Sequence, residues 1–94
     1  MEYGSKIVEL RKTKGISQKE LAERSGVAQP YLSLVENNKK EASTVTLKKI
    51  AKVLEIPLPF LMFMALDETD IPEDKASRFK DIAPILESLI KQLI

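Results

Sequence analysis

The stretch Ser17–Asn38, which reads SQKELAERSGVAQPYLSLVENN, constrains the fold more than any other part of the chain. It contains two short helical patterns, one opening at Ser17 and one running from about Gln29 to Glu36. Gly26 separates them, and glycine adopts the positive φ that ends a helix and redirects the chain at low cost. The sequence therefore predicts two short helices joined by a tight turn.

The first helix of this pair carries its own start signal. Ser17 can accept a hydrogen bond from the backbone N–H of Glu20, and the Glu20 side chain can reach back to the N–H of Ser17, as in a capping box. Two helices of this size around a glycine-containing turn are what a helix-turn-helix unit needs. The apolar positions expected to be buried are Leu21 and Ala22 in the first helix, and Leu32 and Val35 in the second.

Three further helices are predicted on either side of this unit. The first runs from about Gly4 to Lys14 and ends at a glycine; the next runs from Thr44 to about Leu54, with Ser43 as its N-cap. The last runs from about Pro59 to Leu66, with its proline in the first turn. Because this last helix is apolar nearly all round, more than one of its faces must be covered, and an interface there is expected.

An ion pair between Arg11 and Glu36 is predicted from burial alone. Arg11 lies four residues after Ile7 and so shares the buried face of the first helix. A buried arginine needs a carboxylate partner, and Glu36, near the end of the third helix, is the candidate.

The C-terminal third has a different character. An acidic linker follows Leu66, with one or two helical turns expected near Glu73–Phe79. The segment Asp81–Ile94 has a helical apolar stripe; Asp81 is its predicted N-cap, which puts Pro84 in the first turn. Such a stripe either packs back on its own domain or meets a second chain, and we favour self-association. We therefore expect a helix-turn-helix domain at 1–66 and a dimerising helical extension at 67–94. The residues predicted to form the dimer interface are Phe60, Phe63, Met64, Ile82, Leu86, Leu89 and Leu93.

Composition excludes several kinds of site. The chain has no cysteine and no histidine, which removes disulfides, thiolate metal sites, the usual general base and the commonest metal ligand. The sequence shows neither a pair of catalytic carboxylates nor a glycine-rich loop that would bind phosphate. We therefore expect neither an enzyme nor a bound cofactor or metal. No signal peptide is recognisable, and the longest apolar run, Leu58–Leu66, is too short to cross a bilayer. We expect a cytoplasmic protein.

The net charge of +1 hides an asymmetry between the two parts of the chain. Residues 1–58 carry eleven bases and seven acids, a net charge of +4, whereas residues 59–94 carry four bases and seven acids, a net charge of −3. A basic N-terminal part fits a domain that binds a polyanion. The charge of +4 on residues 1–58, taken alone, is explained equally well by ordinary surface charge.

Several motifs together resemble the phage-repressor/Cro-type (Xre-type) helix-turn-helix regulators. They are LRK followed by a glycine, the SQxELA opening, the SGV turn, the YLSxVEN pattern and the TLxKIAxxL pattern, within about Ser5–Leu66. The resemblance implies a compact all-α, five-helix DNA-binding domain. It also implies a transcriptional regulator, a repressor by preference, that acts as a homodimer on double-stranded DNA with two-fold symmetry. The C-terminal extension lies outside this resemblance.

The resemblance also implies which residues meet DNA, because in that family the start of the third helix enters the major groove. The positions matched to base contacts are Gln29, Pro30, Ser33 and Leu34. Those assigned to phosphate contacts are Gln18, Tyr31, Asn37, Asn38, Lys39 and Lys40. Arg11 and Glu36 match the family's structural ion pair. Gln29 is the strongest base reader, since a glutamine amide can pair with adenine N6 and N7 together.

Three residues depart from the family's pattern. Ala28 stands where a capping Ser or Thr is common, Pro30 removes a donor from the reading surface, and Leu34 replaces a polar or basic residue. We therefore expect few direct base contacts, with affinity that depends on phosphate contacts and dimerisation. The alternative is that Gln18 and Gln29 are simply solvated residues at helix ends, and that Lys39 and Lys40 belong to an ordinary solvated loop.

A second class of function stays open at this point. The apolar helix at about Pro59–Leu66 and the C-terminal stripe could bind another protein, as an antitoxin-like interaction module would. A homodimer in solution favours the regulator, and a chain that is monomeric or aggregated without a partner favours the interaction module.

Overall fold

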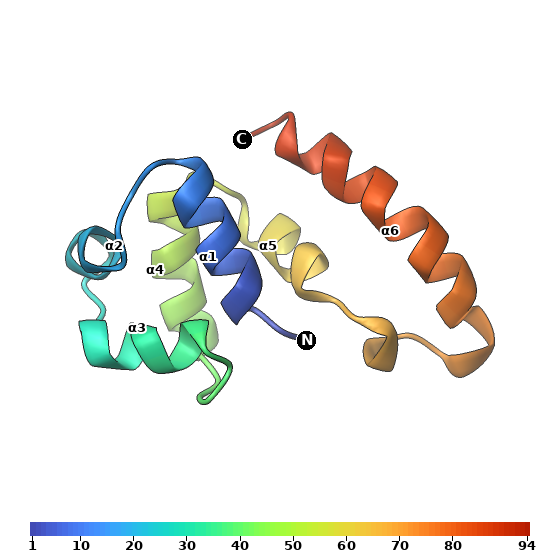
Figure 1. The fold of residues 1–94 in the computed structure, drawn as a ribbon, viewed down its shortest axis with the longest axis horizontal. Helices are drawn as coiled ribbons and strands as arrows, with labels where there is room; N and C mark the ends of the chain where they lie inside the picture. The colour runs from blue at the N-terminus through green and yellow to red at the C-terminus, as the bar shows by residue number, and fades with distance from the viewer.

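The computed structural model describes all residues, 1–94, and contains helices and turns but no strand. Six α-helices and two short 3₁₀ turns follow one another along the chain (Figure 1). The predicted all-α class is confirmed, as are the first five helices to within a residue or so at each end. The bounds are α1 Gly4–Thr13, α2 Gln18–Ser25, α3 Gln29–Glu36, α4 Thr44–Leu54, α5 Leu58–Ala65, η1 Glu68–Asp70, η2 Glu73–Lys75 and α6 Ala76–Lys91.

Local capping explains where α2 and α4 begin. The Ser17 hydroxyl accepts from the Glu20 N–H, and the Ser43 hydroxyl accepts from the Thr46 N–H, at 3.0 and 3.1 Å. Each bond satisfies one of the N–H groups that a helix start leaves without a partner. The other half of the predicted capping box is absent, because Glu20 is engaged with Arg24 one turn later instead of reaching back to Ser17.

Residues in the left-handed region lie at or just after the C-terminal ends of α2, α3 and α4. Gly26 has φ +71° and ends α2, which confirms the turn predicted between α2 and α3. Asn38 has φ 57° in the loop after α3, and asparagine tolerates this conformation better than most residues. Glu55 adopts the same φ, 57°, at the end of α4, although it lacks the short polar side chain of Asn or Asp that lowers the energy of this conformation.

One apolar core holds α1 to α5 together. The buried positions predicted in α2 and α3 all lie in it, together with the buried residues of α4, Ile7 and Leu10 of α1, and Leu61 of α5. In α5, Leu61, Met64 and Ala65 are buried and Phe60 packs against the core, so one side of this apolar helix is covered within the chain. Met62 remains 40% exposed on its other side.

The start of the sixth helix differs from the prediction. The helix begins at Ala76, after the turns η1 and η2, rather than at an Asp81 N-cap, so Pro84 lies inside it and not in its first turn. A proline there removes one backbone hydrogen bond of the helix. The prediction was wrong because Ala76 and Phe79 continue the inward face of the helix upstream of the proline.

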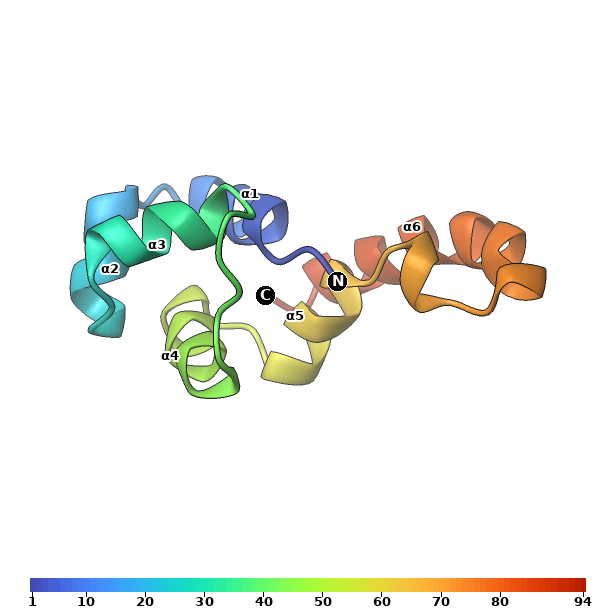
Figure 2. The same ribbon diagram turned by 90° about the horizontal axis from the view of Figure 1, so that it is seen from below.

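The inward face of α6 is narrow. Its half-buried positions are Ala76, Phe79, Ala83, Glu87 and Ile90, and Ile94, just after the helix, continues the spacing of three or four residues. Ile90 and Ile94 pack against the core, at the end where the helix returns toward the first five helices (Figures 1 and 2). The remainder of α6 lies to one side of that domain, and the molecule measures 41 × 28 × 19 Å.

Ion pairs attach α6 to α1. Lys6 donates to Glu87 at 2.7 Å, and Lys91 donates to Glu9. These contacts shift both partners of the second pair: the hydrogen bond from Lys91 lowers the pKa of Glu9, and Glu9 raises the pKa of Lys91. No helix in the chain combines the length and the apolar character needed to span a membrane.

Candidate nucleic-acid interface

The outer face of α3 is formed by the residues predicted to meet bases. Leu32, Val35 and Glu36 point inward and are buried. Helical geometry puts the other side of α3 outward, and it holds the exposed Gln29, Pro30 and Leu34 with the half-exposed Ser33. Leu34 keeps 42% of its surface exposed.

The predicted ion pair between Arg11 and Glu36 is confirmed, with two parallel hydrogen bonds. Arg11 Nε donates to Glu36 Oε2 and Arg11 Nη2 donates to Glu36 Oε1, both at 3.0 Å. Arg11 Nη1 also donates to the carbonyl of Ile16, at 3.2 Å. The Glu36 side chain is only 4% exposed. This bidentate geometry ties α1, the turn before α2 and the end of α3 into one frame.

Two glutamines extend this ion pair to the surface. Gln18 Nε2 donates to Glu36 Oε1 at 3.1 Å, and Gln29 Nε2 donates to Gln18 Oε1 at 3.3 Å. Gln18 opens α2 and Gln29 opens α3, so the starts of the two helices are linked through their side chains. The sequence predicted both glutamines at the interface but not their link to Glu36.

The loop after α3 holds most of the predicted phosphate contacts. Asn37 Nδ2 donates to the Ser33 carbonyl at 2.8 Å, and Tyr31 donates its hydroxyl to the Glu41 carbonyl at 3.3 Å. Lys40 lies over the Tyr31 ring, with its Nζ 5.4 Å from the ring centre. Lys39 is exposed and makes no ion pair within the chain, so its charge is available to an anion.

Asn38 joins this loop to the start of α1. Its Oδ1 accepts from the N–H of Gly4 at 3.1 Å. Gly4 is buried there, and a Cβ on it would meet the carbonyl oxygens of Glu36 and Val35 at 2.5 and 2.7 Å. Sequence reasoning missed this close approach, since the only signal was a glycine at the expected start of α1.

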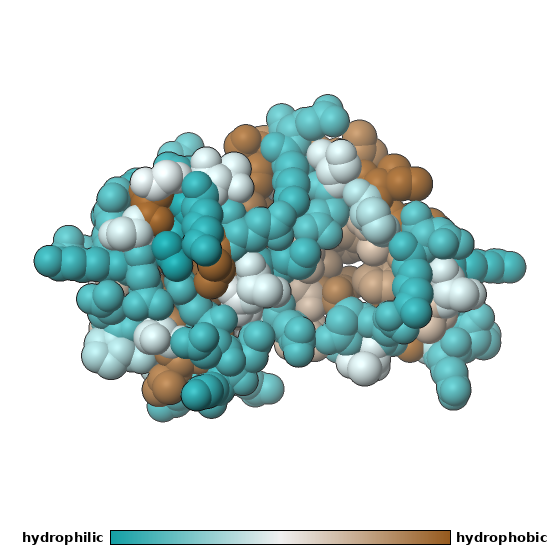
Figure 3. Space-filling model, viewed as in Figure 1, coloured by the Kyte–Doolittle hydropathy of each residue, from teal (hydrophilic) through white to brown (hydrophobic).

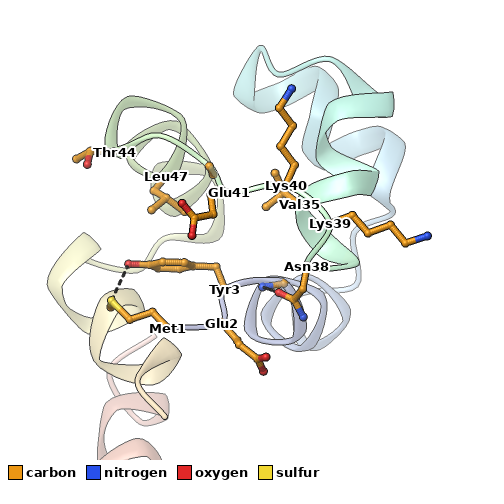
Figure 4. A pocket seen from close by; sticks show the side chains of 12 residues that line it. Met1, Glu2, Tyr3, Val35, Asn38, Lys39, Lys40, Glu41, Thr44 and Leu47 are labelled. Carbon is orange, nitrogen blue, oxygen red and sulfur yellow. Dashed lines mark hydrogen bonds between the residues drawn. The ribbon is translucent and has the colours of Figure 1, made fainter. Parts of the chain in front are cut away.

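A cavity of about 640 Å³ lies between the N-terminal segment, this loop and α4 (Figure 4). Tyr3 reaches into it, and Leu47 of α4 forms part of its wall. Lys39 and Lys40 stand at its rim and extend away from it. The hydrogen bond from Gly4 to Asn38 holds the loop that carries the two lysines against α1, and the cavity remains open between this loop and α4.

The residues predicted for the dimer interface fall into two groups. Phe60 and Phe63 are half-buried on α5, and Met64 is 3% exposed and belongs to the core of the single chain. On α6 the predicted stripe lies outward, and hydrophobic residues gather over this helix in the space-filling view (Figure 3). The exposed fractions are Ile82 51%, Leu86 40%, Leu89 53% and Leu93 71%, with Ile85 62% beside them.

Comparisons with known proteins agree with this geometry. A family model described as helix-turn-helix matches residues 7–61, which is more than half of the chain. The chain belongs to the helix-turn-helix family. An uncharacterized HTH-type transcriptional regulator of Mycobacterium tuberculosis is 44% identical over 62 residues, which are 66% of this chain and 44% of that protein.

Two solved structures extend the comparison. The N-terminal DNA-binding domain of SinR from Bacillus subtilis is 41% identical, with a TM-score of 0.61, over 64% of this chain and 88% of that one. A complex of SinR protein with SinI protein is 32% identical, with a TM-score of 0.63, over 99% of this chain and 90% of that one. The helix-turn-helix chain spans less than half the length of the mycobacterial relative.

Proposed function

We propose that this helix-turn-helix chain is a sequence-specific, DNA-binding transcriptional regulator, a repressor by preference, that acts as a dimer. The observation that carries the proposal is the outer face of α3, where Gln29, Pro30, Ser33 and Leu34 lie exposed on a helix held rigidly from behind by Arg11 and Glu36. A single exposed helix with this support can enter the major groove of DNA. The description of the SinR domain as DNA-binding supports the same reading.

The base contacts come from a small set of groups. Gln29 offers an amide that can pair with adenine, whereas Leu34 offers only an apolar contact to a thymine methyl. Pro30 has no N–H to donate. We therefore propose a limited direct code, with phosphate contacts from the loop after α3 adding affinity that does not depend on sequence.

The test is selection of bound duplexes from a random pool, followed by binding measurements at several salt concentrations. A two-fold symmetric sequence should be enriched, and its affinity should fall steeply as salt rises, because released counterions drive phosphate binding. A pool that stays random after several rounds contradicts the proposal.

Two variants separate the roles of the groups on this face. Gln29→Ala should cost about 1–3 kcal/mol at one base position and relax the preference there. Lys39→Ala should weaken binding to every sequence alike and reduce the salt slope by about one. If both variants weaken all sequences equally, the assignment of Gln29 to a base is wrong.

We further propose that the exposed stripe of α6 binds a second copy of this chain. Ile82, Leu86, Leu89 and Leu93 are each at least 40% exposed, although helical spacing puts them on one face. An apolar face of this kind on a small protein marks an interaction surface. A dimer through α6 would present two copies of α3 to the two half-sites of a symmetric operator.

Light scattering on the full chain tests the stripe. The wild type should be a dimer and Leu89→Lys a monomer, because a lysine at the centre of the interface would be buried without a partner. Ser77→Lys is the matched control, since it adds the same charge on the opposite side of the same helix and should leave the dimer intact. A wild-type monomer would favour a different protein partner for α6, as the SinR complex with SinI suggests.

A further inference from the structure

Two residues on the outer face of α3 have side chains that form no hydrogen bond. Pro30 is exposed in the first turn of the helix, and Leu34, one turn later, keeps 42% of its surface exposed. Residues four apart lie on the same side of a helix, so the proline ring and the leucine side chain are neighbours. Gln29 and Ser33 have the same spacing and form a polar row beside them. The outer face of α3 therefore has one polar row and one apolar row.

The packing of the fold does not account for this apolar pair. The core takes Leu32 and Val35 from α3, and Tyr31 packs against it, whereas Pro30 and Leu34 do not belong to it. A single exposed leucine is ordinary on a protein surface. Here it stands with a second apolar residue on the face that the proposed function directs into the major groove. The pair is available to a ligand, and changing Leu34 should leave the core intact.

The chemistry of the major groove limits what this pair can bind. The base edges there carry hydrogen-bond donors and acceptors and one apolar group, the C5-methyl group of thymine. A donor or acceptor covered by Pro30 or Leu34 would lose its water without gaining a partner, which is unfavourable. A methyl group covered by them leaves water instead, with a gain of about fourfold in affinity for each methyl group.

The dimensions of the pair fit one or two methyl groups. Four residues advance about 6 Å along a helix, and successive bases of one strand are about 3.4 Å apart. The ring of Pro30 is rigid, and α3 is held from behind by Arg11 and Glu36. The two side chains can therefore reach the C5 positions of neighbouring bases without further ordering of the backbone.

The same methyl group occurs on a second base. 5-Methylcytosine carries it at the ring position where thymine does, and the two bases differ at position 4, where cytosine has an amino group and thymine an oxygen atom. Neither Pro30 nor Leu34 has a side-chain group that can bond to either of these. The pair therefore responds to the methyl group and not to the identity of the base that carries it.

We propose that Pro30 and Leu34 form a binding site for the C5-methyl group of a pyrimidine, which accepts thymine or 5-methylcytosine and disfavours uracil and unmethylated cytosine. The inference rests on the proposed function and deepens it, since it names a chemical group that α3 recognises beside the contacts of Gln29. Methylation of a cytosine at this position strengthens binding, so the regulator responds to the methylation state of its DNA site.

The test changes one methyl group at a time in the duplex that the random-pool selection enriches. Deoxyuridine replaces each thymine in turn, which removes the methyl group and keeps every hydrogen bond of the base pair. The affinity of the wild-type chain should fall about fourfold at one or two thymines of each half-site and stay the same at the others.

The second arm adds the methyl group back on a different base. At each sensitive position, the thymine–adenine pair is replaced by cytosine–guanine, with and without a methyl group at C5 of the cytosine. The methylated duplex should bind about fourfold more tightly than the unmethylated one. Equal binding of the two duplexes would overturn the inference.

Leu34→Asn tests the protein side, because asparagine nearly matches the shape of leucine but ends in a polar amide. The ratio of affinities for thymine and uracil should fall to near one at one or both sensitive positions. Both chains are measured on the same duplexes, so any effect of the methyl group on the shape of the DNA cancels. Met62→Ala is the matched control, since it shortens a side chain of similar exposure, 40%, on α5 and should leave the ratio unchanged. Thermal unfolding checks that both variants are folded.

The proposed function and the methyl site fail in different ways. A wild-type chain that enriches no DNA sequence overturns the proposed function. A wild-type chain that enriches a site in which no deoxyuridine changes the affinity overturns the methyl site alone. A preference for thymine over uracil that Leu34→Asn leaves in place overturns it as well, because other residues or the shape of the DNA then report the methyl group.

Discussion

Gly4 has a packing role that its helix position does not reveal. It lies at the first position of α1, buried against the end of α3, with its N–H bonded to Asn38. Three oxygen atoms, two of them backbone carbonyls, lie within 2.7 Å of where a Cβ would stand. Real Cβ atoms do not approach backbone this closely, so α1 can meet the end of α3 only through a glycine.

Gly4→Ala should therefore destabilise the protein, although alanine is the better helix former. Helix propensity alone would favour the variant by up to about 1 kcal/mol, whereas overpacking against backbone costs about 1–3 kcal/mol. We expect a net loss of about 1–2 kcal/mol in the free energy of unfolding, measured in urea.

Ser5→Ala is the matched control for this substitution. It lies next in the same helix and is exposed, so it should change stability by less than about 0.5 kcal/mol. An increase in the free energy of unfolding of Gly4→Ala would show that α1 can shift away from α3 without cost.

At this scale, some contacts could be predicted from the sequence and others could not. The pair between Arg11 and Glu36 follows from helical spacing and from the need of a buried arginine for a carboxylate. The bond between Gln18 and Glu36 does not, because it depends on how α2 and α3 are packed in space. Spatial packing also decides why a glycine is needed, so the sequence alone does not distinguish a glycine that permits a turn from one, such as Gly4, that permits a close contact between helices.

At the scale of the element, α3 lacks the cap that α2 and α4 have. Ala28 occupies its N-cap with φ −61° and ψ 132° and makes no side-chain bond, whereas Ser17 and Ser43 each accept from the N–H three residues on. Pro30 cannot use such a cap because it has no N–H, which leaves Tyr31 as the residue whose N–H would benefit.

Ala28→Ser should therefore stabilise the protein by about 1 kcal/mol, seen as a higher midpoint of thermal unfolding. Ser43→Ala is the reciprocal control, and it should lower stability by a similar amount because α4 would lose an existing cap. If Ala28→Ser is neutral while Ser43→Ala is destabilising, the backbone at the start of α3 does not let the hydroxyl reach Tyr31.

The elements also show where pattern reading succeeds. Serine caps mark the starts of α2 and α4, and glycines mark the ends of α1 and α2, because these signals act within a few residues. The sequence predicts too late a start for α6, because the local rule that places a proline in the first turn of a helix is overridden here by packing. Ala76 and Phe79, upstream of the proline, are half-buried on the inward face of α6, so the helix begins before Pro84.

At the scale of the whole molecule, the first five helices and the sixth are joined by different forces. A shared apolar core holds α1 to α5, and from the C-terminal part only Ile90 of α6 and Ile94, just after it, pack against this core. The remaining link between α6 and α1 is the set of ion pairs among Lys6, Glu87, Lys91 and Glu9. The all-α fold of the domain could be predicted because hydrophobic spacing dictates it, whereas the position of α6 depends on charges far apart in the sequence.

The attachment of α6 should consequently depend on pH and salt more than the domain does. The hydrogen bond from Lys91 holds the pKa of Glu9 below its ordinary value of 4.5, against a smaller opposing effect of burial. A carboxylate with a lowered pKa contributes its stabilisation above the ordinary pKa and loses it as the pH falls through the lowered one. Docking of α6 should therefore be complete at neutral pH and weaken below about pH 4.

Because the chain has no cysteine, Thr13→Cys and Gln92→Cys allow two spin labels on exposed positions of α1 and at the end of α6. The label distance should lengthen or broaden between pH 7 and pH 3.5, and also at neutral pH in 1 M salt, since these pairs are partly exposed and are screened. Glu9→Gln should broaden it already at pH 7. A distance that stays the same in acid and in salt would mean that Ile90 and Ile94 alone hold α6 in place, so that apolar packing rather than charge fixes the extension beside the helix-turn-helix domain.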